Sequence, residues 1–166
     1  MVVLWYGGEV QLDKPEEMEE SLKIGVVGFS RNQFDQEAAR RLLRKYFVQL
    51  REKHGERVIE IVSGYTAQGV PLIAYKLAGE YGMRTVGFSA KQALRVRAGV
   101  FPCNEEIIVG ERFGDESEAF VRYIDGLIRI GGGPQSRREV AMFSALHAGP
   151  ELPQRLVEEE VAWYGK

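Results

Sequence analysis

Short, nearly continuous apolar runs alternate in this chain with longer segments of helical periodicity, and this alternation restricts the folds that the chain can adopt. The first run, residues 23–29, reads KIGVVGF, which is typical of a strand buried on both faces of a sheet. In the next segment, residues 34–53, apolar side chains recur at the spacing of an amphipathic helix. We expect Asn32 to cap this helix, with Asp35 as its capping-box partner.

Four further apolar runs predict strands at residues 58–63, 85–88, 106–109 and 127–130, and helical periodicity follows three of them, at residues 70–81, 116–124 and 136–146. Strands that alternate with helices form a parallel sheet with right-handed crossovers and helices on both faces. The sequence therefore predicts a Rossmann-like α/β fold, with three αβα layers around a mainly parallel sheet of five or more strands. Its core should include Val26, Val27, Ile61, Val62, Val86, Ile108 and Ile128.

The length of 166 residues suits one domain. We expect a single Rossmann-like domain over residues 1–166, with its core at about 23–146. Outside this core, residues 2–6 are expected to form an edge strand and residues 153–164 a short amphipathic helix. Both extensions are expected to pack on the core or to form a dimer contact.

Composition limits the classes of partner. The net charge of −2 argues against a surface that holds a nucleic-acid backbone. No apolar run approaches the roughly 18 residues of a membrane span, and the N-terminus does not resemble a signal peptide. The single Cys103 cannot form an internal disulfide, so we expect a cytoplasmic protein. His54 and His147 are far apart and no Cys/His spacing suggests zinc, so we expect no metal and no resident cofactor.

Candidate binding residues lie in loops that follow predicted strands, because ligands of such folds sit at the carboxyl ends of the strands. The first loop holds Gly28, Ser30 and Arg31, a set that can hold an anion at a helix start but that also fits an ordinary capped turn. The second runs from Ser63 and Gly64 to Gly69. Its glycines let the backbone approach a ligand closely, although a simple turn is the alternative.

The third loop is the strongest signal. Gly131, Gly132 and Gly133 directly follow a buried strand, and Ser136 and Glu139 fall in the first turn of the next helix. Three glycines cost conformational entropy on folding, so a plain turn rarely uses them. They leave backbone N–H groups open to an anion, with the Ser136 hydroxyl beside them. Glu139 either faces the same cavity or only favours the helix dipole.

Residues 132–139, GGPQSRRE, resemble the G-G-x-G-T-x-x-E motif of the LONELY GUY family, nucleoside-monophosphate phosphoribohydrolases once labelled lysine decarboxylases. The ordered set of three loops also resembles the wider SLOG superfamily of Rossmann-like nucleotide binders. The resemblance implies that a nucleotide phosphate lies across the helix starts at 64–69 and 131–136, with the sugar near Glu139 and with Ser30 and Arg112 as further contacts. It also implies a homodimer.

The motif departs from the family at three places. Gln135 stands where the hydrolases have a glycine, Ser136 replaces threonine, and Arg112 is only an approximate match to their Arg-Lys pair. The preferred hypothesis is therefore a protein that binds a nucleotide or another phosphate-bearing small molecule. The alternative is a phosphoribohydrolase in which the Glu139 carboxylate stabilises an oxocarbenium-like transition state. A third hypothesis is a sensor or carrier that binds its ligand without turnover.

Overall fold

The computed structural model describes residues 3–6, 9–12 and 20–165. Six parallel strands form one sheet, so the chain has a Rossmann-like α/β fold, as the sequence predicts. In sequence order the strands are β3 (Leu22–Gly28), β4 (Ile59–Ser63), β5 (Arg84–Ser89), β6 (Glu105–Ile108), β7 (Gly126–Ile130) and β8 (Leu156–Glu159). Their order in space is β6-β5-β4-β3-β7-β8.

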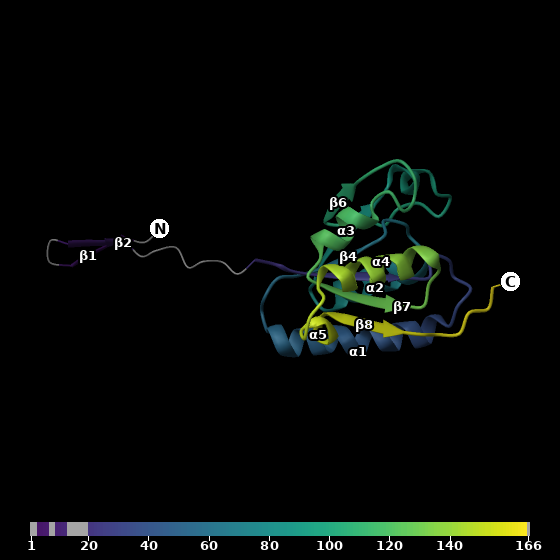
Figure 1. Ribbon diagram of the computed structural model, residues 1–166. Helices are drawn as coiled ribbons and strands as arrows, with labels where there is room; N and C mark the ends of the chain where they lie inside the picture. The colour runs from purple at the N-terminus through teal and green to yellow at the C-terminus, as the bar shows by residue number, and fades with distance from the viewer. Residues whose placement is uncertain (1–2, 7–8, 13–19, 166) are drawn as a thin grey trace.

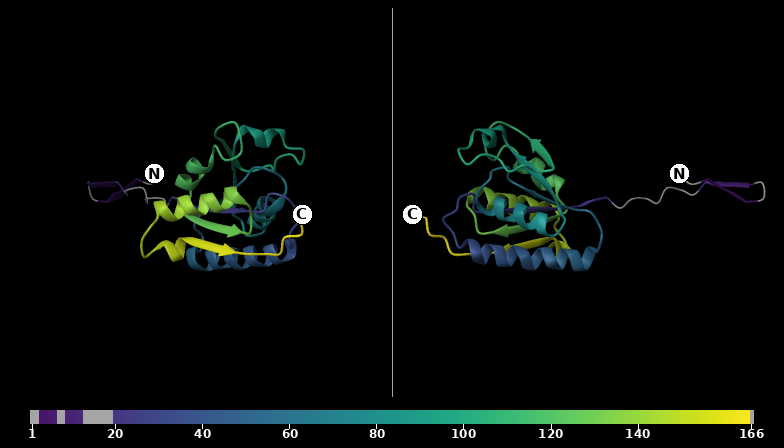
Figure 2. Two further views of the ribbon diagram at one scale, coloured as in Figure 1. Left: turned by 45° about the vertical axis from the view of Figure 1, so that its right-hand side comes forward. Right: turned by 180° about the vertical axis from the view of Figure 1, so that it is seen from behind.

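Helices cover both faces of this sheet, as Figures 1 and 2 show. One face carries α1 (Gln36–His54) and α2 (Gly69–Glu80), and the other carries α3 (Ser117–Tyr123) and α4 (Pro134–Leu146). A 3₁₀ helix, η1 (Lys91–Arg95), follows β5. No helix in the described ranges is both long and apolar enough to span a membrane.

The two cores follow from the alternation of side chains along each strand. On β3, Ile24 and Val26 pack with α1 and α2, whereas Val27 packs with α3 and α4. Six of the seven predicted core residues are buried: Val26, Val27, Ile61, Val62, Val86 and Ile128. The seventh, Ile108, is half-buried because β6 is an edge strand with a neighbour on one side only.

The strand order reverses between β3 and β7. From β3 the chain moves outward through β4, β5 and β6, and it then returns to place β7 on the other side of β3. In open parallel sheets, such a switch point leaves a crevice at the carboxyl ends of the two central strands. The first and third glycine-containing loops meet there.

The cap of α1 differs from the sequence-based prediction. Asp35, not Asn32, caps this helix, and its carboxylate accepts a hydrogen bond from the Ala38 N–H. The Asn32 side chain reaches another helix, where its oxygen accepts a hydrogen bond from the Gly69 N–H at the start of α2. The prediction was wrong because it considered only local partners, whereas this contact spans 37 positions.

Both terminal extensions also differ from expectation. Residues 153–164 do not form a helix: after the single turn α5 (Leu152–Arg155), β8 pairs in parallel with β7. Leu156 packs with the α3 and α4 core and Val157 with the α1 and α2 core, which is the alternation of a strand. At the other end, β1 (Val3–Tyr6) is no edge of the main sheet, because it pairs with β2 (Glu9–Leu12) in a sheet of two strands. Residue 2 lies outside the described residues.

Candidate ligand-binding site

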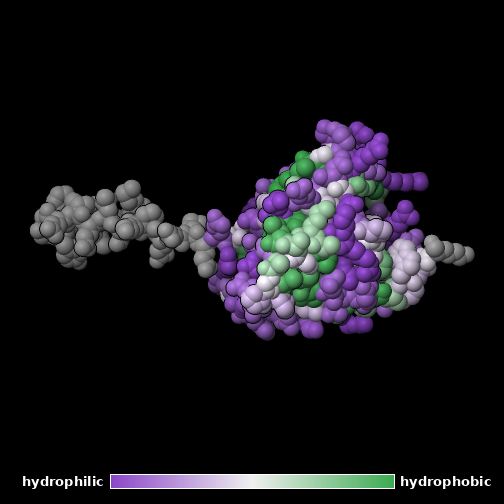
Figure 3. All heavy atoms as spheres, viewed as in Figure 1, coloured by the Kyte–Doolittle hydropathy of each residue, from purple (hydrophilic) through white to green (hydrophobic). Residues whose placement is uncertain are grey.

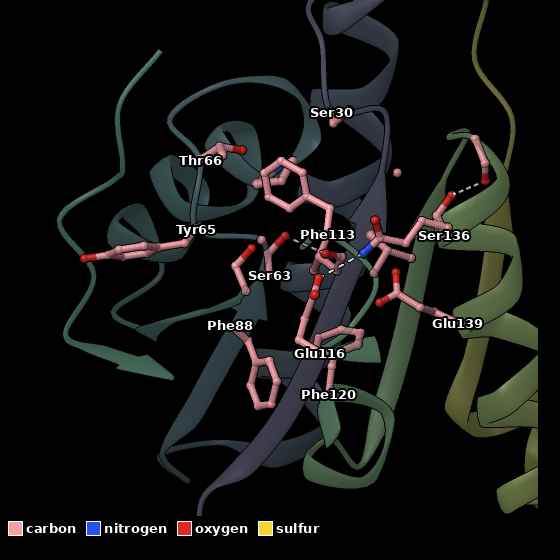
Figure 4. Close-up of a pocket in the computed structure, with 18 of the residues that line it drawn as sticks. Ser30, Ser63, Tyr65, Thr66, Phe88, Phe113, Glu116, Phe120, Ser136 and Glu139 are labelled. Atoms are coloured by element: carbon pink, nitrogen blue, oxygen red, sulfur yellow. Dashed lines mark hydrogen bonds between the residues drawn. The ribbon is translucent and has the colours of Figure 1, made fainter. Parts of the chain in front are cut away.

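A cavity of about 530 Å³ opens at the carboxyl ends of β3, β4 and β5, beside the start of α4 (Figure 4). Residues of all three predicted loops line it, although they are far apart in the sequence. The predicted site residues on its wall are Gly28, Ser30, Arg31, Ser63, Gly64, Gly133, Gln135, Ser136 and Glu139. A cavity of this size fits a small organic molecule such as a nucleotide.

Two of the three consecutive glycines serve the packing of the loop. Gly131 and Gly132 are not among the lining residues, and both have positive φ, 57° and 98°. A Cβ on Gly132 would lie 2.2 Å from the Ser136 Oγ and 2.9 Å from the carbonyl carbon of Gly28. The third glycine, Gly133, is different, since it lines the cavity and a Cβ there would meet nothing within 4 Å.

The start of α2 is closed to an anion. The Gly69 N–H donates to the Asn32 side chain, and the Val70 N–H donates to the Phe29 carbonyl. The next residue, Pro71, has no N–H. Gly69 itself does not line the cavity, and a Cβ on it would lie 2.3 Å from the Phe29 carbonyl oxygen. This glycine therefore allows α2 to pack closely on the first loop.

The start of α4 is open by comparison. Gly133 is its N-cap residue and has no side chain that could accept hydrogen bonds from the free N–H groups of the first turn. Gln135 and Ser136 carry such N–H groups, and both residues line the cavity. The Ser136 hydroxyl donates to the Gly133 carbonyl, which fixes the turn. An uncapped helix start of this kind favours an anion through its N–H groups and its dipole.

Among the described residues that line the cavity, Arg31 is the only one with a cationic side chain. Arg112, the other candidate, lies in an exposed turn and is not part of the wall. Its backbone N–H donates to Asp115, whose carboxylate also accepts from the Glu111 N–H. These two hydrogen bonds lower the pKa of Asp115, so they hold the turn with a charged carboxylate.

Glu139 is buried at the cavity wall, with 5% of its surface exposed. Burial, followed by the negative charge of Glu116, raises its pKa to about 7. The Ser117 hydroxyl and the Gln135 amide are hydrogen-bonding neighbours of this carboxyl and lower its pKa, but by less than burial and Glu116 raise it. Glu139 is therefore poised to exchange a proton near neutral pH.

Glu116 completes the site and was missed in the sequence. It is 4% exposed and accepts hydrogen bonds from the Gln135 amide, at 3.0 Å, and from the Gly114 N–H. Figure 4 shows its carboxylate and that of Glu139 pointing toward the same part of the cavity. A charged residue at the start of a short helix usually faces water, so nothing in the local pattern separates Glu116 from an exposed carboxylate.

Four aromatic side chains also line the cavity, and none of them was predicted from the sequence as part of the site: Tyr65, Phe88, Phe113 and Phe120. The rings of Phe88 and Phe120 pack edge to face, with centroids 5.7 Å apart. Phe113 is 41% exposed, so it keeps surface with which it can cover a flat ligand. The sequence offered a signal for Phe88, because this residue ends a predicted strand and ligands of such folds bind at strand ends.

The described residues include no cluster of three or more His, Cys, Asp or Glu side chains that could hold a metal ion. The cavity combines instead an uncapped helix start, a guanidinium, two carboxyl groups and aromatic rings. This set can hold an anionic group at one end and an uncharged ring at the other.

Comparison with protein-family models gives no match, and comparison with curated proteins gives none. Among solved structures, the chain is similar to the molybdenum cofactor binding protein of the phototrophic bacterium Rippkaea orientalis, with a TM-score of 0.61 and 17% identity over 85% of this chain and 77% of that one. It is also similar to the molybdenum cofactor carrier protein of Chlamydomonas reinhardtii, with a TM-score of 0.58 and 18% identity over 84% of this chain and 89% of that one. The likeness establishes the fold.

Proposed function

We propose that this chain is a SLOG-type protein that binds a phosphate-bearing small molecule, such as a nucleotide, in the cavity beside α4. The observation that carries the proposal is the uncapped start of α4, whose N–H groups at Gln135 and Ser136 share a cavity with the Arg31 guanidinium. The phosphate would bind there and not at the start of α2, where the N–H groups of Gly69 and Val70 already donate hydrogen bonds to Asn32 and to the Phe29 carbonyl.

Binding without hydrolysis is favoured over the phosphoribohydrolase alternative. Stabilisation of an oxocarbenium-like transition state needs a charged carboxylate. Burial raises the pKa of Glu139 to about 7, so its charged form is less favoured than that of an exposed carboxylate. In addition, Arg112 is not on the cavity wall. A protein that holds and delivers its ligand, as a carrier or sensor does, fits these features better.

The fold neighbours suggest a more specific ligand. Two proteins that share the fold are a binding protein and a carrier protein for the molybdenum cofactor. We therefore include this cofactor, beside nucleotides, among the candidate ligands.

A homodimer in the cytoplasm is also proposed. Figure 3 shows apolar surface gathered on the face that bears α3 and α4. Exposed apolar side chains of α4 on the described chain are Ala141, Ala145 and Leu146. Contiguous apolar surface often marks a contact between proteins.

Two substitutions at Gly133 test the anion site. Its φ of −99° and its open surroundings allow a side chain, and both Asp and Asn are good N-cap residues, so both variants should fold at least as stably as the parent. In Gly133→Asp, however, the carboxylate repels a phosphate at the same N–H groups. We expect nucleoside 5′-monophosphates to bind Gly133→Asp roughly 10- to 100-fold more weakly than Gly133→Asn, since like charges at close range cost a few kcal/mol.

The measurement is calorimetric titration with a panel of nucleoside 5′-monophosphates, with free base followed by chromatography in the same samples. Equal affinities of the two variants for every nucleotide that binds would contradict the anion site, as would the absence of binding to the parent. Rapid base release that Glu139→Gln abolishes would favour the hydrolase alternative.

A further inference from the structure

The cavity has two chemically different ends. Ser30 and Arg31 belong to the first loop, whereas Glu116 and Glu139 come from the segment before α3 and from α4. In Figure 4, Ser30 lies well apart from the two carboxyl groups, with Phe88 and Phe120 on the side of the carboxyls. A phosphate is repelled by Glu116 and Glu139, which favours an anionic ligand whose phosphate lies at the Arg31 side of the α4 start.

The two carboxyl groups differ in their hydrogen bonds. Glu116 accepts from Gln135 and Gly114 at 3.0 Å each, which fixes its position and leaves further acceptor capacity on its two oxygens. Glu139 is 5% exposed and lines the cavity, with the Ser117 hydroxyl and the Gln135 amide as neighbouring donors. A carboxyl has more acceptor sites than these two donors fill, so a ligand N–H can also be accommodated.

The surroundings of the carboxyl pair are aromatic. Phe88 and Phe120 lie on their side of the cavity, whereas the ring of Phe113 points toward Thr66 (Figure 4). Aromatic walls with a few fixed polar groups are typical of sites for flat ring ligands. The two carboxyl groups add acceptors at this end, beside the Gln135 amide, so a ring that presents N–H donors fits there.

We propose that Glu116 and Glu139 bind the edge of a nitrogen heterocycle that presents two adjacent N–H donors, as the amino-oxo-pyrimidine edge of guanine does, and so orient the ligand with its phosphate toward Arg31. This inference rests on the proposed function and adds the class of ring to it. Glu116 accepts from the two donors. The Glu139 carboxyl, when it is neutral, donates to the exocyclic oxygen beside these donors. An adenine edge offers a single donor beside an acceptor nitrogen and satisfies the pair less well.

Three ligands separate the two ends of the site: GMP, IMP and guanosine. IMP lacks the 2-amino donor and guanosine lacks the phosphate, while each keeps the rest of GMP. A hydrogen bond to a charged group contributes enough that its loss weakens binding by about 10- to 100-fold. We therefore expect GMP to bind the parent protein at least about tenfold more tightly than IMP.

Glu116→Gln replaces an acceptor with an amide and should reduce the GMP-to-IMP preference toward one. Glu118→Gln is the matched control, because Glu118 lies on α3 in exposed contact with Arg122 and does not line the cavity, so the preference should stay as in the parent. If thermal melting shows that Glu116→Gln is unstable, Glu139→Gln provides a second test. It should also bind GMP with a smaller preference over IMP than the parent does.

The outcomes distinguish this inference from the proposed function. If GMP binds no more tightly than guanosine, the phosphate site is wrong. If GMP exceeds guanosine but equals IMP, the phosphate site stands and the ring assignment is overturned. A GMP preference over IMP that survives both glutamate substitutions would also overturn the assignment of these two residues.

Discussion

The raised pKa of Glu139 predicts an unusual stability effect in the ligand-free protein. In the folded state this carboxyl keeps its proton up to about pH 7, whereas in the unfolded chain it loses the proton near its ordinary value of 4.5. Between these values the folded state binds more protons than the unfolded state. The stability of the parent therefore falls as the pH rises through this window. Glu139→Gln has nearly the same shape and no charge, so it should escape this loss.

The magnitude follows from the difference between the two pKa values. Each unit corresponds to about 1.4 kcal/mol, so a carboxyl with a folded pKa of about 7 destabilises the protein by about 3 kcal/mol once both states are charged. Most of the change falls between about pH 5 and about pH 8, over which the advantage of Glu139→Gln should grow by about 2–3 kcal/mol.

Urea denaturation of the parent and of Glu139→Gln at several pH values measures this advantage. Carboxyls that do not interact with Glu139 titrate equally in both proteins and cancel in the difference. Glu118→Gln is the control, since its exposed carboxyl in α3 should give a small difference that hardly varies with pH. A pH-independent difference for Glu139→Gln, or a variant that is less stable at about pH 8, would refute the reasoning.

Two further predictions concern the sheet and the assembly. Arg129 is buried on β7, where it pairs with Glu158 and Glu160 and donates to the Gly131 carbonyl. Arg129→Met should lower the free energy of unfolding, measured in urea titrations, by about 1–3 kcal/mol, because the buried carbonyl loses its charged donor. Arg137 is exposed and, among the described residues, pairs only with Glu160, so Arg137→Met should change the free energy of unfolding by less than about 1 kcal/mol. Equal losses in the two variants would contradict the larger contribution of Arg129. If the apolar face over α4 forms the homodimer, Leu146→Glu should change the sedimenting species from two chains to one, and a parent that sediments as one chain would overturn the dimer.

The strands of the sheet could be predicted because burial on both faces leaves a direct record in the sequence. Val26 and Val27 are consecutive and both buried, one on each side of β3, which only a central strand allows. The same reasoning failed for Ile108, since an apolar run does not tell whether its strand lies at the centre or at the edge. It also missed β8, whose Leu156 and Val157 are only half-buried and whose nearby charges resemble an amphipathic helix.

The positions of the loops that line the cavity could be predicted, but the state of their N–H groups could not. Glycines after buried strands mark where loops turn at the carboxyl edge. Which helix start is open depends on contacts across the chain, such as the one from Asn32 to Gly69. Glu116 was missed for a similar reason, because only the fold brings it beside Glu139 and Gln135.

The central claim is that an anion binds the start of α4, and backbone amide shifts measured by NMR test it most directly. Titration of the ¹⁵N-labelled protein with GMP should shift the N–H signals of Gln135 and Ser136, because these groups line the cavity at the uncapped helix start. The signals of Gly69 and Val70 should move much less, since their N–H groups already donate to Asn32 and to the Phe29 carbonyl. Large shifts at Gly69 and Val70 with none at Gln135 and Ser136 would contradict the account.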